Sequence, residues 1–212
     1  NVALMKGLPD KILDDISVRC EMMLPKDMLE QINSVLPENK HYKNPRNAAS
    51  GISRRLDGYL CKYLALVAYD LVVWPGTLAT EAESFNEDEK IKLHKKYGFR
   101  TPEQTIGNVD EMVGAYKTWK DMREDYPFGI DGVVIKVNSW QTQVEAGMVD
   151  NRPKGQIAWK FDPPGAVTTF LEEEWCVGRT GVVTPLAHLK PVDIDGSTVS
   201  KATLHNIAEI KR

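Results

Sequence analysis

The sequence predicts an α+β protein of two domains, residues 1–163 and 164–212. In the first region, segments with apolar residues at helical spacing alternate with short β-branched runs. Beyond it come short strands and turns with no helical pattern until the end of the chain, which is typical of a small β-barrel. The Pro163-Pro164-Gly165 segment between the two regions is the predicted domain boundary.

The first region begins with a strand, a helix, a second helix and a second strand. Residues 15–24 have the mixed apolar character of a strand. Apolar positions at helical spacing predict a helix from Pro25, and proline is favoured at a first helical position. An alanine-rich helix is predicted to begin near Pro45. The long apolar run that ends at Trp74 contains β-branched residues and predicts a central strand.

Two more helices are predicted before the next strands. Residues 86–98 carry acids in the first turn, bases in the last turn and a glycine at the end. Asn108 and Glu111 resemble a capping pair for the following helix, whose apolar stripe includes Tyr116 and Trp119. The later segments with strand character are joined by Gly/Pro turns: 129–138, 155–161 and 166–178.

Two lysines lie within these predicted strands. Side chains on a strand alternate between faces, so Lys136 shares a face with Gly132, and Lys160 shares a face with Ala158. Each ammonium group therefore stands beside small residues and needs an anion or water. A phosphate held between the two lysines is one hypothesis, and a strand face exposed to solvent is the alternative. The opposite face of the second strand is predicted to enter the core: Ile157, Trp159 and Phe161.

Cations are concentrated in "KNPRNAASGISRR", residues 43–55, which contains no acid. If this segment is helical, Arg46 and Arg54 lie about two turns apart on similar faces. Guanidinium groups suit bidentate contacts with phosphate, although a solvated helix face would look the same. Arg123 continues the stripe of Tyr116, so its stem is predicted to lie against the core.

Composition excludes several classes of protein. The chain is 42% hydrophobic and 27% charged with a net charge of −3, so it buries a core and is not a wholesale basic nucleic-acid binder. No apolar run approaches the ~18 residues of a membrane helix, and we expect no membrane partner. The cysteines form no C-x-x-C pair, so we expect no zinc site, no disulfide framework and a cytoplasmic location: Cys20, Cys61 and Cys176.

Together, these stretches resemble the NAD-dependent DNA ligases. The similar segments occur in the order and spacing of that family: "VRCEMMLPK" (18–26), "NPRNAASG" (44–51), "IDGVVIKVN" (130–138), "IAWKF" (157–161), "VGRTGVVTP" (177–185) and "VSKATLHN" (199–206). Cys20 stands where the family usually has glycine. The resemblance implies part of a nucleotidyltransferase (ATP-grasp-like) domain with antiparallel sheets and flanking helices, followed by an incomplete OB-fold barrel.

The resemblance also implies contacts with the nucleotide. Lys136 and Lys160 would contact the AMP moiety, chiefly its phosphate. Glu21 would lie at the ribose, although a lone strand carboxylate is usually solvated. Tyr69 would stack on adenine, although by default it reads as a core aromatic residue. Asp131 would position a lysine or bind a metal.

Other residues are implied to contact DNA. Arg46, Arg54 and Arg123 would serve binding of nicked DNA and adenylyl transfer, and Arg179 would contact DNA from the OB-fold domain. The implied substrates and cofactors are NAD, Mg²⁺ and nicked double-stranded DNA, in replication and repair. The implied reaction is a series of three phosphoryl-group transfers, in which fixed positive charge stabilises the transition states.

One family motif does not occur in the sequence. The family's nucleophile is the lysine of K-x-D-G, upstream of the segment that resembles residues 18–26, and no K-x-D-G is present. We expect the lysine and the nicotinamide-binding module to belong to a further segment or a partner chain. The alternative is a catalytically inactive homologue that binds nucleotide or DNA. An ATP-using relative is a weaker alternative, because "NPRNAASG" resembles the NAD-using branch.

Overall fold

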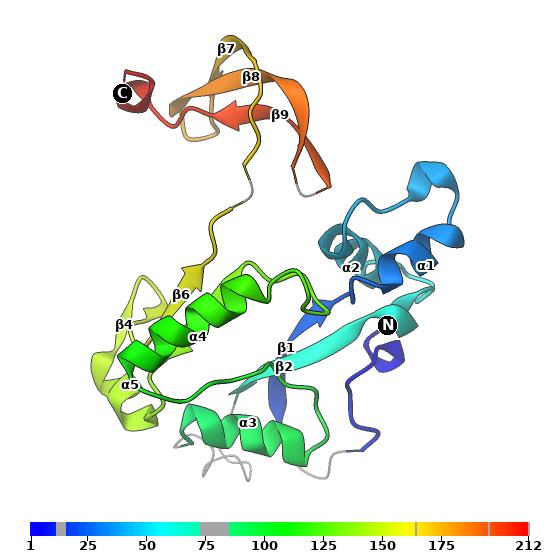
Figure 1. Cartoon of the computed structure of the whole chain (residues 1–212), viewed down its shortest axis with the longest axis vertical. Helices are drawn as coiled ribbons and strands as arrows, with labels where there is room; N and C mark the ends of the chain where they lie inside the picture. The colour runs from blue at the N-terminus through cyan, green and yellow to red at the C-terminus, as the bar shows by residue number, and fades with distance from the viewer. Residues whose placement is uncertain (12–15, 73–84, 164, 195, 212) are drawn as a thin grey trace. The chain divides into compact units, whose positions relative to one another are not determined.

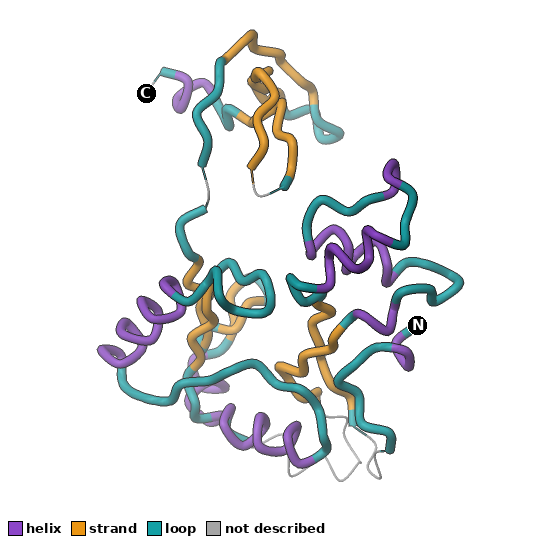
Figure 2. Tube along the Cα trace, turned by 45° about the vertical axis from the view of Figure 1, so that its right-hand side comes forward, coloured by secondary structure: helices purple, strands orange, loops and turns teal. Residues whose placement is uncertain are grey.

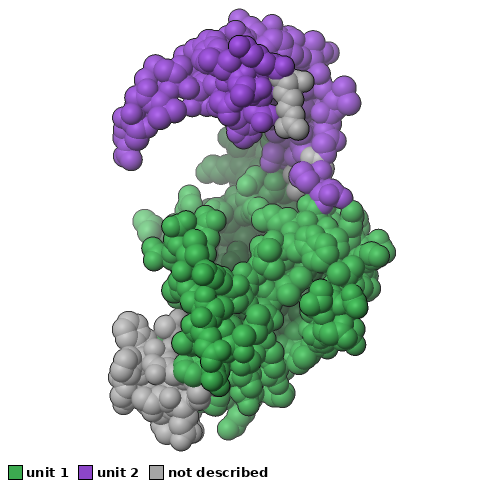
Figure 3. Space-filling view, turned by 90° about the vertical axis from the view of Figure 1, so that its left-hand side faces the viewer, with its two compact units in different colours: residues 1–161 green, residues 162–212 purple. Residues whose placement is uncertain are grey.

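The computed structural model describes residues 1–11, 16–72, 85–163, 165–194 and 196–211. The chain folds into two compact units, Asn1–Phe161 and Asp162–Arg212, which are coloured separately in Figure 3. The mixture of helices and antiparallel sheets confirms the predicted α+β class.

The first sheet pairs two strands that are far apart in the sequence. β1 (Ser17–Met23) runs antiparallel to β2 (Ala65–Val72), and the register is interrupted between Arg19 and Cys20. Both strands were predicted, and β2 is largely buried because it consists mainly of apolar residues. The predicted end of the second strand, at Trp74, lies outside the described residues.

Two helices cover the core of this region. α1 (Met28–Ser34) and α2 (Pro45–Ser53) were both predicted, although α1 begins after Pro25. The side chain of Asn44 caps α2 by accepting a hydrogen bond from the backbone of Asn47. The buried core joins both helices to β2 and the N-terminal segment: Met5, Leu24, Ile32, Ala48, Ala49, Ile52, Leu60, Cys61, Leu64 and Leu66. Short 3₁₀ helices also occur in this part: η1 (Val2–Leu4), η2 (Glu38–Lys40) and η3 (Cys61–Tyr63).

The next two helices begin at capping boxes. α3 (Glu87–Lys96) begins after Asn86, and α4 (Val109–Asp121) begins after Asn108, as predicted. α3 lies beside β2, and α4 lies beside the second sheet (Figure 1). In the last turn of α3, the side chain of His94 is fully buried.

The second sheet pairs β3 (Gly132–Lys136) with β6 (Gln156–Lys160) in antiparallel register. Glycine at position 132 permits this pairing, because a Cβ there would lie 2.7 Å from the Cα of Lys160. The connection between the strands contains elements that the sequence analysis missed: α5 (Trp140–Ala146), β4 (Met148–Val149) and β5 (Arg152–Pro153).

The predicted core face of β6 is only partly correct. Phe161 is buried. Ile157 and Trp159 are 65% and 37% exposed, so their placement in the core was wrong, although Trp159 stacks on Tyr116 of α4 with ring centroids 4.0 Å apart. α4 covers the Trp159 end of this face, and its partly buried stripe of side chains was predicted correctly.

The second unit is an open sheet. β7 (Phe170–Val177), β8 (Val183–Ile194) and β9 (Ser197–Thr203) pair in that order with antiparallel neighbours, and α6 (Ile207–Ile210) follows. These strands, orange in Figure 2, make up most of the unit. Within the described residues the sheet does not close into a barrel, which agrees with the expectation of an incomplete OB fold.

Candidate functional site

Asp131 brings two of the proposed phosphate-contacting residues together. Its Oδ2 lies 2.8 Å from Lys160 Nζ and 3.6 Å from Arg46 Nη2. The backbone places the carboxylate, since the carbonyl of Asp131 accepts a hydrogen bond from the N–H of Phe161 and extends the β3–β6 ladder by one residue. Tyr116 of α4 donates to the carbonyl of Lys160 and holds β6 from the other side.

This cluster carries an excess of positive charge. The hydrogen bond from Lys160 is the main reason why the pKa of Asp131 lies below its usual value, and the charge of Arg46 adds to the effect. Asp131 is therefore ionised at neutral pH and balances one of its two cationic neighbours. The side chains of Lys160 and Arg46 are 69% and 80% exposed, so their remaining N–H groups are open to an anion.

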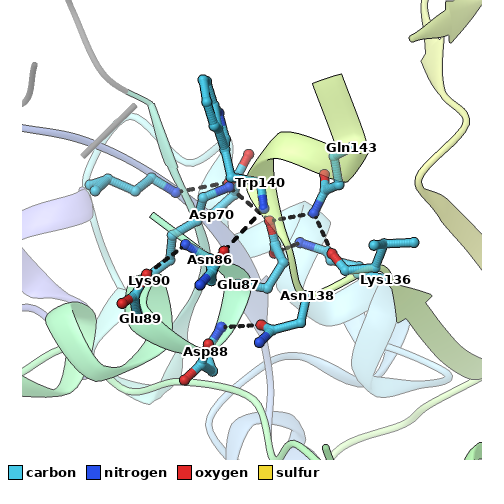
Figure 4. A network of polar contacts seen from close by, with 12 residues as sticks. Asp70, Asn86, Glu87, Asp88, Glu89, Lys90, Lys136, Asn138, Trp140 and Gln143 are labelled. Atoms are coloured by element: carbon cyan, nitrogen blue, oxygen red, sulfur yellow. Dashed lines mark hydrogen bonds and ion pairs between the residues drawn. The ribbon is translucent and has the colours of Figure 1, made fainter. Parts of the chain in front are cut away.

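Lys136 lies on the same face of the sheet but has a different partner. Gly132 pairs with Lys160, so Lys136 lies four residues further along β3, roughly 13 Å away at the rise of a strand. The ammonium of Lys136 lies 2.8 Å from Glu87 Oε2, at the start of α3 (Figure 4). Burial alone would raise the pKa of Glu87, but hydrogen bonds from Lys136 and Lys90 together hold that pKa below its usual value.

Glu21 and Tyr69 both belong to the first sheet. Glu21 pairs with Val67 on β2. Tyr69 is the residue of β2 left without a partner where the register shifts between Ala68 and Asp70. Glu21 is exposed and Tyr69 is 41% exposed, so the default interpretation of Tyr69 as a core residue was wrong.

The other predicted arginines lie outside these clusters. Arg54 caps the C-terminal end of α2 and is exposed. Arg123 lies in the turn after α4 with 26% of its side chain exposed, and its backbone carbonyl accepts a hydrogen bond from Lys26. Arg179 is exposed and belongs to the second unit, between β7 and β8.

The residues that meet Lys136 were not predicted from the sequence. Glu87 and Lys90 fit the ordinary charge pattern of a helix, and Gln143 belongs to α5, which was not predicted. Glu87 is 49 positions from Lys136, and nothing in the spacing of the sequence indicated that pairing. The polar residue Ser139, which caps α5, was the available signal for the helix that carries Gln143.

The described residues contain no group of three or more His, Cys, Asp or Glu side chains that could hold a metal ion. Among them, no helix is both long and apolar enough to cross a membrane.

Comparison with known proteins places these features in a family. The family model for the "NAD-dependent DNA ligase adenylation domain" matches residues 1–164, and the model for the "NAD-dependent DNA ligase OB-fold domain" matches residues 167–212. Curated relatives named "DNA ligase" include those of Halothermothrix orenii, 39% identical over 100% of this chain, Pediococcus pentosaceus, 36% over 99%, and Coxiella burnetii, 37% over 93%.

The chain spans only part of those relatives. The match covers 32% of the Halothermothrix and Pediococcus proteins and 30% of the Coxiella protein. The remaining parts of the relatives have no counterpart among the 212 residues.

Proposed function

The chain belongs to the NAD-dependent DNA ligase family, and on that premise we propose that it holds an adenylate and takes part in sealing nicks in duplex DNA. The observation that carries the proposal is the junction of Lys160, Arg46 and Asp131. Two cations that share one carboxylate keep one positive charge unbalanced, which the oxygens of a phosphate can neutralise.

Each residue of the site has a proposed part. Lys160 and Arg46 contact the α-phosphate of the adenylate, and Asp131 positions both. Lys136 adds a further cation on the same face of the β3–β6 sheet. On the β1–β2 sheet, Glu21 contacts the ribose and Tyr69 stacks on the adenine, in keeping with the exposure of both side chains. The proposed contacts with DNA come from arginines: Arg46, Arg54, Arg123 and Arg179.

The proposed reaction has three transfers. A lysine amine attacks the α-phosphorus of NAD and expels nicotinamide mononucleotide, forming a phosphoramide bond to AMP. The DNA 5′-phosphate then displaces the lysine and takes the AMP. Finally, the 3′-hydroxyl attacks that 5′-phosphate, releases AMP and closes the phosphodiester. The site residues supply fixed positive charge to each phosphorus centre, where negative charge grows in the transition state.

The attacking lysine is proposed to come from outside residues 1–212, because no K-x-D-G occurs among them. A further segment or a partner chain would supply it together with the nicotinamide-binding module. Mg²⁺ enters the proposal as an ion carried by substrate phosphates and water, and no step is assigned to a metal bound by the described residues. Replication and repair of DNA in the cytoplasm are the proposed setting.

Complementation tests the proposal. The chain is mixed with a ligase segment that carries K-x-D-G and the nicotinamide-binding module, together with NAD and Mg²⁺. We expect covalent AMP on the added segment only when the chain is present. Lys160→Ala should slow adenylation by about 100-fold, since it removes a cation aimed at the reacting phosphate. Lys154→Ala, at an exposed lysine just before β6, is the matched control and should have no effect.

Two results would contradict parts of the proposal. Covalent AMP on the chain by itself would show that the attacking lysine lies within residues 1–212. Binding of AMP without any adenylation of the added segment would identify a catalytically inactive nucleotide-binding homologue.

A further inference from the structure

Lys26 joins two segments of the first unit that are far apart in the sequence. Its ammonium group donates to the carbonyl of Arg123, 97 positions away, at 3.0 Å and to the carbonyl of Glu124 at 2.7 Å. The backbone N–H of Lys26 also donates to the carbonyl of Pro127 at 2.8 Å. Three hydrogen bonds from one residue therefore hold the turn that follows α4.

The backbone of Lys26 is itself fixed. β1 ends at Met23, and Leu24 is buried in the core with 2% of its surface exposed. The carbonyl of Lys26 accepts a hydrogen bond from the N–H of Leu29 where α1 begins. The half-buried side chain of Lys26 thus reaches the turn from a rigid base.

The two carbonyl groups that Lys26 contacts lie just past the C-terminal end of α4, whose last residue is Asp121. Carbonyl groups at this end of a helix lack partners within the helix and carry partial negative charge, so a nearby cation is favourable. Lys26 supplies that cation from another part of the chain. Without its ammonium group, the carbonyls of Arg123 and Glu124 would lose these donors, and the turn would no longer be held in one conformation.

Arg123 is the residue whose side-chain direction this turn sets. Only 26% of its side chain is exposed, so its stem lies against the protein. Its Nε lies 3.8 Å from Oε1 of Glu124, but the side chain of Glu124 is 86% exposed, and such a pair contributes little. The guanidinium group therefore remains available to a phosphate, and the backbone that carries it is the part that Lys26 holds.

We propose that Lys26 is a positioning residue for DNA binding, whose ammonium group fixes the backbone at Arg123 and so directs the guanidinium group of Arg123 at a phosphate of the nicked duplex. This inference rests on the proposed function, in which Arg123 contacts DNA. Lys26 acts through Arg123 and does not touch DNA, because two of its three N–H donors are already used.

The test is fluorescence anisotropy of the full chain with a labelled nicked duplex, across a range of salt concentrations. Arg123→Ala should reduce the slope of log K against log salt by about 0.9, the value for one phosphate contact. Lys26→Met keeps the length of the side chain but removes its donors. It should reduce the slope almost as much and weaken binding about fivefold, although Arg123 is still present. Lys26→Arg keeps both charge and donors and should retain the wild-type slope.

Two further measurements separate positioning from a direct contact or a general loss of charge. In an Arg123→Ala background, Lys26→Met should cause no further change in slope, because the contact it supports is already gone. Lys117→Met, at an exposed lysine of α4, makes the same charge change and should leave the slope as it is. Urea unfolding checks that each variant is folded. If Lys26→Met does not fold, Lys26→Gln replaces it; Lys26→Gln keeps one amide donor and should reduce the slope by about half as much.

The possible failures are distinguishable. If the folded neutral variant of Lys26 keeps the wild-type slope while Arg123→Ala does not, the role of Lys26 is overturned and the proposed function stands. If Lys26→Met lowers the slope further in the Arg123→Ala background, Lys26 contacts DNA itself and the inference is again overturned. If the wild-type chain does not bind the nicked duplex, the proposed contact with DNA fails and takes this inference with it.

Discussion

His94 is a polar side chain in an apolar position. It lies in the last turn of α3, fully buried, with its ring in edge-to-face contact with Phe99 at 6.0 Å. Neither ring nitrogen has a hydrogen-bond partner within the described residues. Burial is the main cause that lowers the pKa of His94. The nearby cations Lys90 and Lys136 lower it further, whereas Asp70 and Glu87 oppose the shift.

His94→Leu should therefore stabilise the protein. At pH 7 the gain should be about 1–2 kcal/mol in the free energy of unfolding, because unpaired polar atoms no longer need to be buried. Because the pKa of His94 is lowered in the folded chain, the unfolded chain binds more protons at this residue than the folded chain does as the pH falls below about 6.5. Stability should therefore fall as the pH drops below that value, and His94→Leu should remove this contribution.

Urea unfolding at pH 7.5 and 5.5 measures both effects. His205→Leu, at an exposed histidine of the second unit, is the control and should leave the difference between the two pH values unchanged. A His94→Leu protein that loses as much stability on acidification as the wild type would contradict the assignment.

At the scale of single residues, the sequence predicted which face of a strand a side chain occupies, but not which residue that side chain pairs with. Period-two alternation correctly put Lys136 and Gly132 on one strand face, because a pleated strand permits nothing else. It could not show that Lys136 pairs with Glu87, since that contact depends on how α3 packs. The roles of the site residues stay predictions.

At the scale of elements, β3 and β6 approach each other closely at Gly132. A Cβ at position 132 would lie 2.5 Å from the carbonyl oxygen of Trp159 and 2.7 Å from the Cα of Lys160, both backbone atoms that cannot turn aside. Gly132→Ala should therefore lower the free energy of unfolding by about 1–3 kcal/mol, as overpacking usually does. It should also weaken AMP binding, since it displaces Lys160.

Gly114→Ala is the matched control for that substitution. Gly114 lies inside α4, and a Cβ there would meet nothing within 4 Å. The substitution should raise stability by up to about 1 kcal/mol, because alanine favours the helix over glycine. Urea unfolding of both variants checks the pair, and a Gly132→Ala protein as stable as Gly114→Ala would refute the steric argument.

Elements with a strong local signal were predicted, and elements without one were missed. α2, α3 and α4 each begin at an asparagine cap, and each was expected from its sequence. The local signal of α5 was only its cap at Ser139, which was overlooked. β4 and β5 have two residues each, too short for periodicity to reveal. Ile157 was misplaced because alternation gives a face but does not say how far a neighbour covers it.

At the scale of the whole molecule, binding of DNA must overcome a net charge of −3. Residues 43–55 differ from the rest of the chain because they carry cations and no acid, and Arg54 among them is exposed. We expect the chain to bind nicked duplex weakly, with an affinity that falls steeply as salt increases. Arg54→Ala should reduce the slope of log K against log salt by about 0.9, the value for one phosphate contact.

Fluorescence anisotropy with a labelled nicked duplex, across a range of salt concentrations, measures that slope. Lys96→Ala, at an exposed lysine in the last turn of α3, carries the same charge change and should leave the slope as it is. Equal slopes for the wild type and Arg54→Ala would remove Arg54 from the proposed DNA-contacting set.

Family membership was the most predictable property of the molecule, because the motifs that carry it are short and lie in order along the chain. The open sheet of the second unit also followed from the sequence, since residues 164–212 are too few for a five-stranded barrel. The exact domain boundary, between residues 163 and 164, stays a prediction.

The strand pairings also bear on how the chain reaches its native state. In the second unit each strand pairs with the next one along the chain, as Val177 does with Val183. In the first unit, Glu21 pairs with Val67, and the chain between these two residues contains the helices α1 and α2. Closing a short loop costs less entropy than closing a long one, so the C-terminal ladder has the lower initial barrier. The strands of the second unit are therefore expected to pair before those of the first unit.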